Sequence, residues 1–241
     1  MRWGIDGDII CYAVGFASND DPVEYALRSA RTAVENIMHT LSADGADIYL
    51  TNGPDNYRFD IDPNYKGNRS GAPKPVHIQA IREFFVEKMD AVMCYGQEAD
   101  DAMGIAATQH GHGIATLDKD LDGIAGVHYN WKKGKVYYVS PEAADQFFYK
   151  QMLTGDSTDN IPGLFKMTGK KAMKKVVEPL AYMDTPQEMY AHVREVYSDA
   201  YDAVGMCPDD REEVLDGWLL RIGRCLWIRR EENQMWEFPN G

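Results

Sequence analysis

Acidic residues follow several short apolar segments of this chain at close spacing. An Asp-Gly-Asp sequence comes after the first segment, Glu-Ala-Asp-Asp after a later one, and Asp-Lys-Asp after a third. A further motif, Gly-Asp-Ser-Thr-Asp, carries two acids at a spacing that would place both on one side of a helical turn. The nine acidic residues are Asp6, Asp8, Glu98, Asp100, Asp101, Asp118, Asp120, Asp156 and Asp159.

These carboxylates would repel one another if gathered at one site, which raises their pKa values and destabilises the fold unless cations neutralise them. The set contains no His or Cys, so all its donors are hard oxygen atoms. Such donors suit Mg²⁺ or Mn²⁺ and argue against zinc or copper. Two ions about 3.5–4 Å apart could activate a water and stabilise the leaving oxygen of an in-line phosphoryl displacement.

Alternating strand and helix patterns would position these acids. Strands are predicted at residues 1–5, 47–50, 91–95 and 113–117, and helices at 23–41, 76–89 and 100–109. This order predicts an α/β fold with a mostly parallel central sheet flanked by helices. Ligands of such sheets bind beyond the carboxyl ends of the strands, where the acids would lie. Segments 127–131 and 135–139 predict a hairpin at the sheet edge.

The strand pattern ends at Pro141, and the second part of the chain is predicted to be helical, at 141–153, 169–178, 186–204 and 211–229. We therefore expect an α/β catalytic core at residues 1–153 and a helical region at 154–241. The loop from Gly53 to Pro75 is rich in Gly, Pro, Asn and Asp but carries Arg58, Lys66 and Arg69. A long basic loop of this kind is more often functional than accidental.

The net charge of −13 over 241 residues is unusual for a DNA-binding protein, because phosphate contacts need Lys and Arg. The charge is unevenly distributed. Residues 184–216 hold ten acids and two arginines, whereas residues 166–175 hold five lysines and no acid. Neutralising the nine candidate metal ligands would leave −4, so much of the acidity can belong to metal binding. Such an uneven distribution of charge suits a protein that presents one basic face to a polyanion.

The spacing of the cysteines and the length of the apolar runs indicate the cellular compartment of the protein. The four cysteines contain no CxxC pair, which indicates neither a disulfide framework nor a zinc ribbon and fits a reducing cytosol. No apolar run approaches the ~20 residues of a membrane span. We expect a cytoplasmic protein that is not embedded in a membrane.

The combination and order of the motifs resembles the 5′-nuclease family, which includes phage 5′→3′ exonucleases, flap endonucleases and the 5′-nuclease domain of bacterial DNA polymerase I. The motifs are Asp6-Gly7-Asp8, Tyr65-Lys66-Gly67-Asn68-Arg69, Glu98-Ala99-Asp100-Asp101, Thr116-Leu117-Asp118-Lys119-Asp120 and Gly155-Asp156-Ser157-Thr158-Asp159-Asn160-Ile161-Pro162-Gly163. They span about residues 1–175. The resemblance implies metal-dependent hydrolysis of DNA phosphodiester bonds, by exonuclease or flap-endonuclease action.

The resemblance also implies roles for individual acids. Those of the tighter metal site are Asp6, Glu98, Asp100, Asp118 and Asp120, and those at or near the second are Asp101, Asp156 and Asp159. Asp8 has no strong counterpart. Family members often carry an Asp after the second strand, where this chain has Thr51-Asn52, so one outer carboxylate is missing.

Basic residues receive roles on the same grounds. The Tyr65 to Arg69 segment would begin a helical arch or clamp near residues 55–90, with Lys66 and Arg69 on the scissile phosphate and Tyr65 stacking on a base. Residues 161–175 resemble a helix–two-turn–helix element that holds duplex DNA and often a K⁺ ion. The expected DNA-binding residues are Lys166, Gly169, Lys170, Lys171 and Arg82. Family members have glycines at the positions of Lys166 and Thr168, which puts K⁺ binding in question.

The expected partner is DNA with a 5′ end, flap or nick, or an RNA–DNA hybrid, bound by a monomer. One alternative is a haloacid-dehalogenase-like phosphatase, because Asp6-Gly7-Asp8 matches its nucleophile pair. Another is a nucleic-acid-binding module without catalysis, which would gain nothing from nine acids that repel phosphates. A calcium-binding EF-hand at Asp118 fails, because position twelve is Tyr129 instead of Glu.

Overall fold

The computed structural model describes residues 1–53, 55–164, 170–203 and 211–239. These form two compact units. Unit 1 comprises 1–57, 71–140 and 228–234, and unit 2 comprises 58–70, 141–227 and 235–241. The sequence-based division at residues 153 and 154 stays a prediction, because compactness alone does not define an independently folding domain. In the described part of the chain, no helix is long and apolar enough to cross a bilayer.

Unit 1 is built on a six-stranded sheet of order β3-β2-β1-β4-β5-β6. The strands are β1 (Arg2–Asp6), β2 (Gly45–Thr51), β3 (Val92–Cys94), β4 (Gly113–Ala115), β5 (Gly126–Asn130) and β6 (Lys135–Val139). The first five run parallel, and only β6 is antiparallel, paired with β5 at the sheet edge. The mostly parallel sheet and the edge hairpin predicted from the sequence are confirmed.

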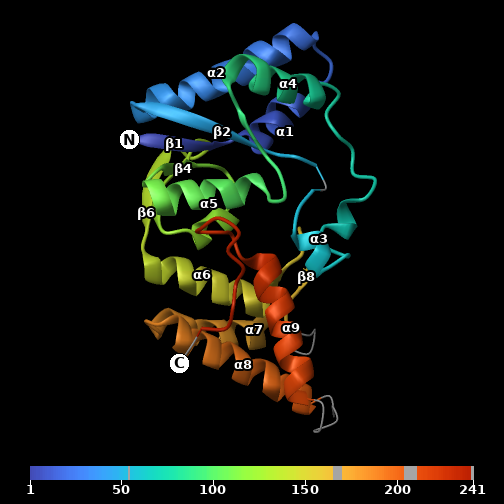
Figure 1. Cartoon of the computed structure of the whole chain (residues 1–241), viewed down its shortest axis with the longest axis vertical. Coiled ribbons are helices and arrows are strands. Elements are labelled where there is room, and N and C mark those ends of the chain that lie inside the picture. Colours follow the sequence, from blue (N-terminus) through green and yellow to red (C-terminus); the bar gives the residue numbers. More distant parts are fainter. Residues whose placement is uncertain (54, 165–169, 204–210, 240–241) are drawn as a thin grey trace. The chain divides into compact units, whose positions relative to one another are not determined.

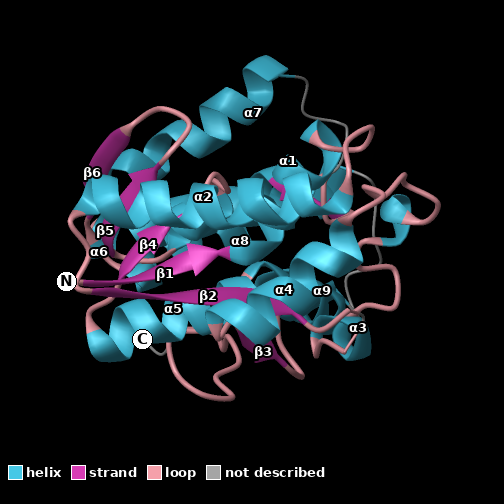
Figure 2. Ribbon diagram, turned by 90° about the horizontal axis from the view of Figure 1, so that it is seen from above, coloured by secondary structure: helices cyan, strands magenta, loops and turns pink. Residues whose placement is uncertain are grey.

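Helices cover both faces of this sheet (Figure 1). On one face lie α1 (Gly7–Ala17), α2 (Val23–Leu41) and α4 (Ile78–Met89), and on the other lies α5 (Ala99–His110), as the turned view of Figure 2 also shows. Side chains of β2 alternate between the two layers. Ile48 and Leu50 join the core beneath α1, α2 and α4, whereas Tyr49 joins the core beneath α5. This alternation is the period-two pattern of a strand buried on both faces.

Helix α1, which the sequence analysis did not predict, begins directly after β1. The Asp6 side chain caps it by accepting a hydrogen bond from Ile9 N at 3.0 Å. Gly7 permits the close turn, since a Cβ atom there would lie 2.7 Å from the backbone oxygen of Tyr49. Residues 9–17 lack the polar stripe that marks an amphipathic helix, so periodicity could not reveal this element.

The C-terminal segment 228–234 returns to unit 1 and packs against α5. A Cβ atom at Gly104 would lie 2.5 Å from the backbone oxygen of Arg229, so a larger residue at position 104 would displace the segment. Arg229 also stacks over the ring of Tyr57 at 4.1 Å and donates to Gln97 at 3.1 Å. These contacts tie the segment to the loop that follows β2 and to the loop that follows β3.

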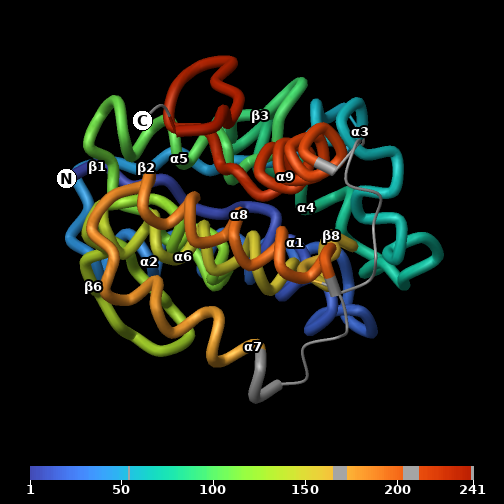
Figure 3. Tube along the Cα trace, turned by 90° about the horizontal axis from the view of Figure 1, so that it is seen from below, coloured from blue at the N-terminus to red at the C-terminus, as the bar shows by residue number. Residues whose placement is uncertain are grey.

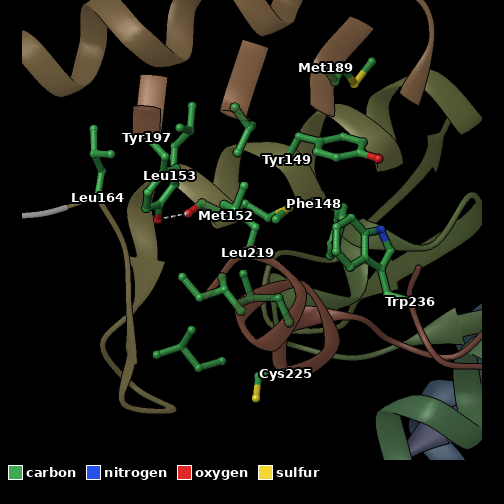
Figure 4. Packing of buried hydrophobic residues seen from close by; sticks show 14 of the residues in the cluster. Phe148, Tyr149, Met152, Leu153, Leu164, Met189, Tyr197, Leu219, Cys225 and Trp236 are labelled. Atoms are coloured by element: carbon green, nitrogen blue, oxygen red, sulfur yellow. Dashed lines mark hydrogen bonds between the residues drawn. The ribbon is translucent and has the colours of Figure 1, made fainter. Parts of the chain in front are cut away.

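Unit 2 is mainly helical, as predicted for the second part of the chain. Its helices are α6 (Pro141–Thr154), α7 (Lys170–Val177), α8 (Pro186–Ala203) and α9 (Arg211–Leu226), with the short elements α3 (Arg58–Ile61), η1 (Gly67–Arg69), η3 (Glu178–Tyr182), β7 (Gly155–Asp156) and β8 (Ile161–Pro162). Helix α6 packs against α7, α8 and α9 (Figure 3). The hydrophobic core of unit 2 includes Phe148, Met152 and Leu219 (Figure 4). Within this core, the Tyr197 hydroxyl donates to the backbone oxygen of Met152 at 2.7 Å.

Candidate active site

Most of the predicted acids lie at one edge of the unit 1 sheet. Asp6 ends β1, Glu98 precedes α5, and Asp118 follows β4. Because β1 to β5 are parallel, their carboxyl ends share this edge, which is where ligands bind in such sheets. We refer to the seven residues as the acidic edge: Asp6, Asp8, Glu98, Asp100, Asp101, Asp118 and Asp120.

Asp6, the last residue of β1, is buried and only 3% exposed. Burial raises the pKa of its carboxyl to about 7, and the nearby charges of Asp8 and Asp118 add to the rise. Hydrogen bonds from Ile9 N and from the hydroxyl of Thr116 act in the opposite direction. A buried carboxylate with like charges beside it fits a site that takes up a cation.

Thr116 connects two of the strands that carry acids. Its hydroxyl donates to Asp6 Oδ2 at 2.8 Å and accepts from Asp118 N at 2.9 Å. Asp118 Oδ1 in turn accepts from Asp120 N at 2.9 Å. The sequence analysis named Thr116 only as part of a motif and did not predict that it positions the acids. Its place directly after an apolar strand and two residues before an acid was the signal that could have identified it.

Glu98 and Asp101 both take part in capping α5. The side chain of Asp101 accepts from Glu98 N at 3.0 Å, and the side chain of Glu98 accepts from the backbone at Asp101. The second carboxylate oxygen of Asp101 accepts from Arg229 N at 3.1 Å, and Glu98 accepts from Asn56 Nδ2 at 2.8 Å. Asp101 is thus completely buried and caps α5. Its role as a metal ligand stays a prediction.

Asp8 and the predicted DNA contact Arg82 form an ion pair. Asp8 also accepts from Thr51 N at 2.9 Å, and Arg82 donates to the backbone oxygen of Thr51. The Arg82 side chain is only 18% exposed, and its contacts with Asp8 and Thr51 hold α4 against β2. Thr51 stands near the position where the family resemblance suggested an acid, and its hydroxyl accepts from Ala99 N at 2.9 Å.

The acids influence one another and their surroundings electrostatically. Burial raises the pKa of the Cys94 thiol to about 12, with contributions from Asp8, Asp101 and Asp100. Within the described residues, no three Asp, Glu, His or Cys side chains form a preassembled metal site. The donor set of the acidic edge is made of hard carboxylate oxygens, which are suitable ligands for divalent metal ions.

The Gly155–Gly163 motif forms a hairpin, and the helical turn expected for it is wrong. Strands β7 and β8 pair antiparallel, with Asp156 opposite Ile161, and the turn between them contains Asp159. Asp156 is buried and accepts from Thr158 N at 2.7 Å. Asn160 adopts a left-handed backbone with φ of 59°, a conformation that Asn tolerates better than most residues. The local sequence therefore favours a turn over a helix.

The predicted phosphate-contacting segment meets this hairpin within unit 2. Tyr65 donates its hydroxyl to Asp159 Oδ2 at 2.8 Å, Arg69 forms an ion pair with the same carboxylate, and Lys66 Nζ lies 3.7 Å from it. Two motifs about ninety residues apart in the sequence are thus brought together. The structure places Tyr65, Lys66 and Arg69 around one acid.

The expected stacking of Tyr65 on a base is wrong, because its side chain is only 3% exposed. The ring packs edge-on against Phe59 with 5.5 Å between ring centroids, inside the core of unit 2. Lys66 Nζ lies 5.0 Å from the ring centroid of Tyr65. Only the hydroxyl of Tyr65 reaches the hairpin, so its contribution must be to hold its neighbours.

Two predicted DNA contacts, Lys166 and Gly169, fall outside the described residues, and so does Thr168, the second position where family members carry glycine. Lys170 and Lys171 begin α7, but their side chains also lie outside the described part. Further along α7, Lys174 and Lys175 are exposed, while Met173, Val176 and Val177 pack against the core. Helix α7 therefore has one apolar face and one basic face over these residues.

The known proteins that this chain resembles have nuclease names. No protein-family model matches the chain. Over 114 residues it is 32% identical to an exodeoxyribonuclease of Enterobacteria phage T3, which covers 43% of this chain and 37% of that protein. The exonuclease of Escherichia phage T7 matches at 32% identity with 38% of its length covered. The chain thus spans well under half the length of these two phage proteins.

A longer alignment of 192 residues, at 26% identity, joins it to a 5′-3′ exonuclease of Buchnera aphidicola subsp. Schizaphis graminum, covering 70% of this chain and 67% of that protein. Among solved structures, T5 5′-exonuclease with zinc ions bound matches with a TM-score of 0.56 at 18% identity, over 94% of this chain and 100% of that one. The T5 D15 flap endonuclease, in a complex with DNA and metal ions, matches with a TM-score of 0.53 at 17% identity, over 93% of this chain and 98% of that one.

The predicted resemblance to 5′-nucleases is confirmed by these matches, and the predicted fold class is confirmed as the fold of T5 5′-exonuclease. The alternatives receive no such support. The EF-hand reading also fails on structure, because strand β4 precedes Asp118 and Tyr129 lies within strand β5.

Proposed function

We propose that this chain is a metal-dependent 5′-nuclease that hydrolyses DNA phosphodiester bonds, as a 5′→3′ exonuclease, a flap endonuclease or both. One observation carries the proposal. The carboxyl ends of parallel strands bring Asp6, Asp118 and the start of α5 to a single acidic edge, in a fold shared with T5 5′-exonuclease. A sheet edge of this composition suits phosphoryl chemistry with divalent cations.

The acidic edge would hold the metal ions. Asp6, Glu98, Asp100, Asp118 and Asp120 would bind the tighter ion, and Asp101, Asp156 and Asp159 are the candidates at the second. When bound, Mg²⁺ or Mn²⁺ ions would supply activation of the attacking water and charge stabilisation on the leaving oxygen. Zinc ions are bound in the structure of T5 5′-exonuclease, and metal ions are present in the T5 D15 complex with DNA.

The chain's own residues orient these ligands and receive the phosphate. The hydroxyl of Thr116 fixes the carboxylate of Asp6 on one side and the backbone of Asp118 on the other. Lys66 and Arg69 would provide positive charge to the phosphate oxygens as negative charge develops there. Both side chains retain exposure for this role, 23% and 47% respectively.

DNA would be held away from the reacting bond by the basic stretch that begins at Lys166 and continues through α7. Lys166, Gly169, Lys170 and Lys171 are the expected contacts, and lysines on phosphates release counterions. A K⁺ ion at residues 161–175 belongs to the same proposal, as does action on RNA–DNA hybrids by a cytoplasmic monomer. For Arg82, the ion pair with Asp8 favours a supporting role over direct DNA contact.

The proposal is tested with 5′-labelled flap, nicked, blunt and RNA-primed duplexes, each incubated with Mg²⁺, with Mn²⁺ and with a chelator. We expect short 5′ products that depend on the metal and on a 5′ end. A small phosphate ester in the same buffers serves as the control for the phosphatase alternative. Release of phosphate from that ester without DNA cleavage would reject the nuclease.

A further inference from the structure

We propose that Asp159 is a positioning residue that docks the loop of residues 64–69 onto the turn of residues 157–160, and that the Tyr65 hydroxyl anchors this contact. We call the two segments the basic loop and the acidic turn. The inference rests on the proposed nuclease function and assigns Asp159 a docking role in addition to the metal ligation that the family resemblance implies. The docked basic loop would present Lys66 and Arg69 to a phosphate group in a fixed arrangement.

The backbone of the acidic turn is matched to the basic loop residue by residue. The carbonyl of Ser157 accepts from Asn68 Nδ2 at 2.6 Å, and the carbonyl of Thr158 accepts from Arg69 Nε at 3.0 Å. The carbonyl of Asp159 accepts from Lys66 N at 2.8 Å. Three consecutive carbonyls thus face one loop.

The fourth residue of the acidic turn completes this match from the opposite direction. Asn160 donates through its side chain to the carbonyl of Asn64 at 2.8 Å. Every residue of the acidic turn therefore has a hydrogen bond to the basic loop, and a chance contact between two surface loops would not show such regularity.

Side chains add a buried anchor and a charged clamp. The Tyr65 ring is fixed in the core of unit 2, and its hydroxyl extends to Asp159 Oδ2. The same carboxylate pairs with Arg69 and lies 3.7 Å from Lys66 Nζ. Asp159 thus holds the two cations close together, although they would otherwise repel each other.

The backbone of Lys66 indicates that this contact stabilises an unfavourable conformation. Lys66 has a φ of 53°, in the left-handed region that residues with a Cβ atom rarely occupy. Such a conformation persists where the surrounding structure enforces it, and it is common at functional sites. The hydrogen bond from Lys66 N to Asp159 O provides that constraint.

Docking has a direct consequence for phosphate binding. The donors that hold the Asp159 carboxylate are those that would bind a phosphate oxygen, since both ligands are anions with planar or tetrahedral oxygen acceptors. A phosphate that takes over these donors does not need to order the basic loop first. This preorganisation would raise the rate of the chemical step more than it would tighten binding.

The test compares Tyr65→Phe, Asp159→Ala and Asp159→Asn with wild type. Amide hydrogen exchange of the basic loop is followed without metal or DNA, and single-turnover cleavage is measured across a Mg²⁺ titration. Tyr182→Phe serves as the matched control, because Tyr182 is 84% exposed in unit 2. It removes the same hydroxyl from a position outside the docking contact.

We expect Tyr65→Phe and Asp159→Ala to speed exchange of the basic loop and to slow single-turnover cleavage by about tenfold or more. The Mg²⁺ concentration at half-maximal rate should remain unchanged in Tyr65→Phe, because this variant keeps the carboxylate of Asp159. Asp159→Asn keeps an oxygen acceptor without the charge, so it should recover part of the protection and part of the rate. Tyr182→Phe should match wild type in every measurement.

The proposal is overturned if Asp159→Ala and Asp159→Asn both raise the Mg²⁺ requirement while the basic loop stays protected, which would make Asp159 a metal ligand only. It is also overturned if Tyr65→Phe exchanges and cleaves like wild type, and this variant decides the matter even if Asp159→Ala fails to fold. Should wild type prove unable to cleave DNA, the nuclease proposal fails, but the exchange data still decide whether docking exists.

Discussion

Asp6 illustrates how burial and metal binding are linked in a single residue. Its carboxyl pKa is raised to about 7 mainly by burial, so below about pH 7 the folded protein without metal favours the protonated form. The unfolded pKa is the ordinary 3.8. A pKa raised on folding gives a stabilising contribution that is fully present below pH 4 and is lost as the pH rises through about 7. A divalent cation beside Asp6 would offset this loss.

We therefore predict that Mg²⁺ raises the melting temperature more at pH 8 than at pH 5. Each kcal/mol of coupling should correspond to roughly 2–4 °C for a chain of this size. The measurement is thermal unfolding with Mg²⁺ and with chelator at both pH values. Asp6→Asn can still cap α1 but cannot ionise, so it should lose the pH-dependent part of the gain. An equal gain at both pH values in wild type would speak against cation binding at Asp6.

Thr116 provides a second prediction for a single residue. Thr116→Val keeps the shape of the side chain but removes the donor to Asp6 and the acceptor for Asp118 N. We expect a loss of about 1–3 kcal/mol in unfolding free energy, because buried polar groups lose their partner. Cleavage should fall at least tenfold, since the ligands at two strand ends lose their orientation.

Urea unfolding and single-turnover kinetics measure both effects of the Thr116 substitution. Thr40→Val, at an exposed position of α2, is the matched control and should change neither quantity appreciably. Normal cleavage by a destabilised Thr116→Val would restrict Thr116 to a structural role.

Individual roles were harder to predict from the sequence than the positions of the acids. The sequence predicted which acids follow strands, because residue type and strand pattern are both local properties. It could not show that Asp101 accepts two backbone N–H groups or that the Tyr65 ring is buried, because these depend on Arg229 and on distant core residues such as Leu219. Contacts between distant segments leave no local signal.

Elements with a clear period were predicted well, and elements without one were missed. Helix α2 was predicted with the bounds that the structure shows, because its apolar residues recur at helical spacing between a Pro start and a left-handed end at Ser42. Residues 9–17 of helix α1 have no polar stripe, so this helix gave no such pattern. The β7–β8 hairpin is too short for any period, and its two acids at helical spacing suggested a helical turn instead.

The apolar residues of helix α7 pack on the core while Lys174 and Lys175 are exposed, so we predict that these lysines contact DNA phosphates. Replacing both lysines with Ala should flatten the plot of log affinity against log salt by up to about 2, and neutralising Lys170 and Lys171 should do the same. Single-turnover cleavage at saturating DNA should remain nearly unchanged. Affinity titrations across a salt series measure this slope.

The matched control for α7 is Lys132→Ala with Lys133→Ala, which removes the same charge from the turn between β5 and β6. If that pair flattens the slope as much as the α7 pair does, the effect reflects net charge and not contact with phosphate.

The molecule as a whole combines a net charge of −13 with a proposed substrate that is a polyanion. Much of this acidity has a local explanation. The acidic edge would be neutralised by metal ions, and Arg194 in α8 pairs with Glu212 and Asp216 of α9 within the acidic stretch 184–216. Binding should therefore depend on metal and on a limited number of lysines, in keeping with an active site that attracts phosphate only when loaded with cations.

The central claim is that the acidic edge hydrolyses DNA through bound metal ions, and Asp118→Asn and Asp120→Asn test it most directly. Each removes one charge and one oxygen ligand. Asp122→Asn is the matched control, since Asp122 lies in the same segment but accepts from the Tyr137 hydroxyl at 2.8 Å. Single-turnover cleavage of a 5′-labelled flap and affinity for the same DNA are measured in Mg²⁺. We predict that cleavage by the first two variants falls below detection while affinity is kept or tightened, and that Asp122→Asn cleaves like wild type. Cleavage at the wild-type rate by Asp118→Asn or Asp120→Asn would contradict the account.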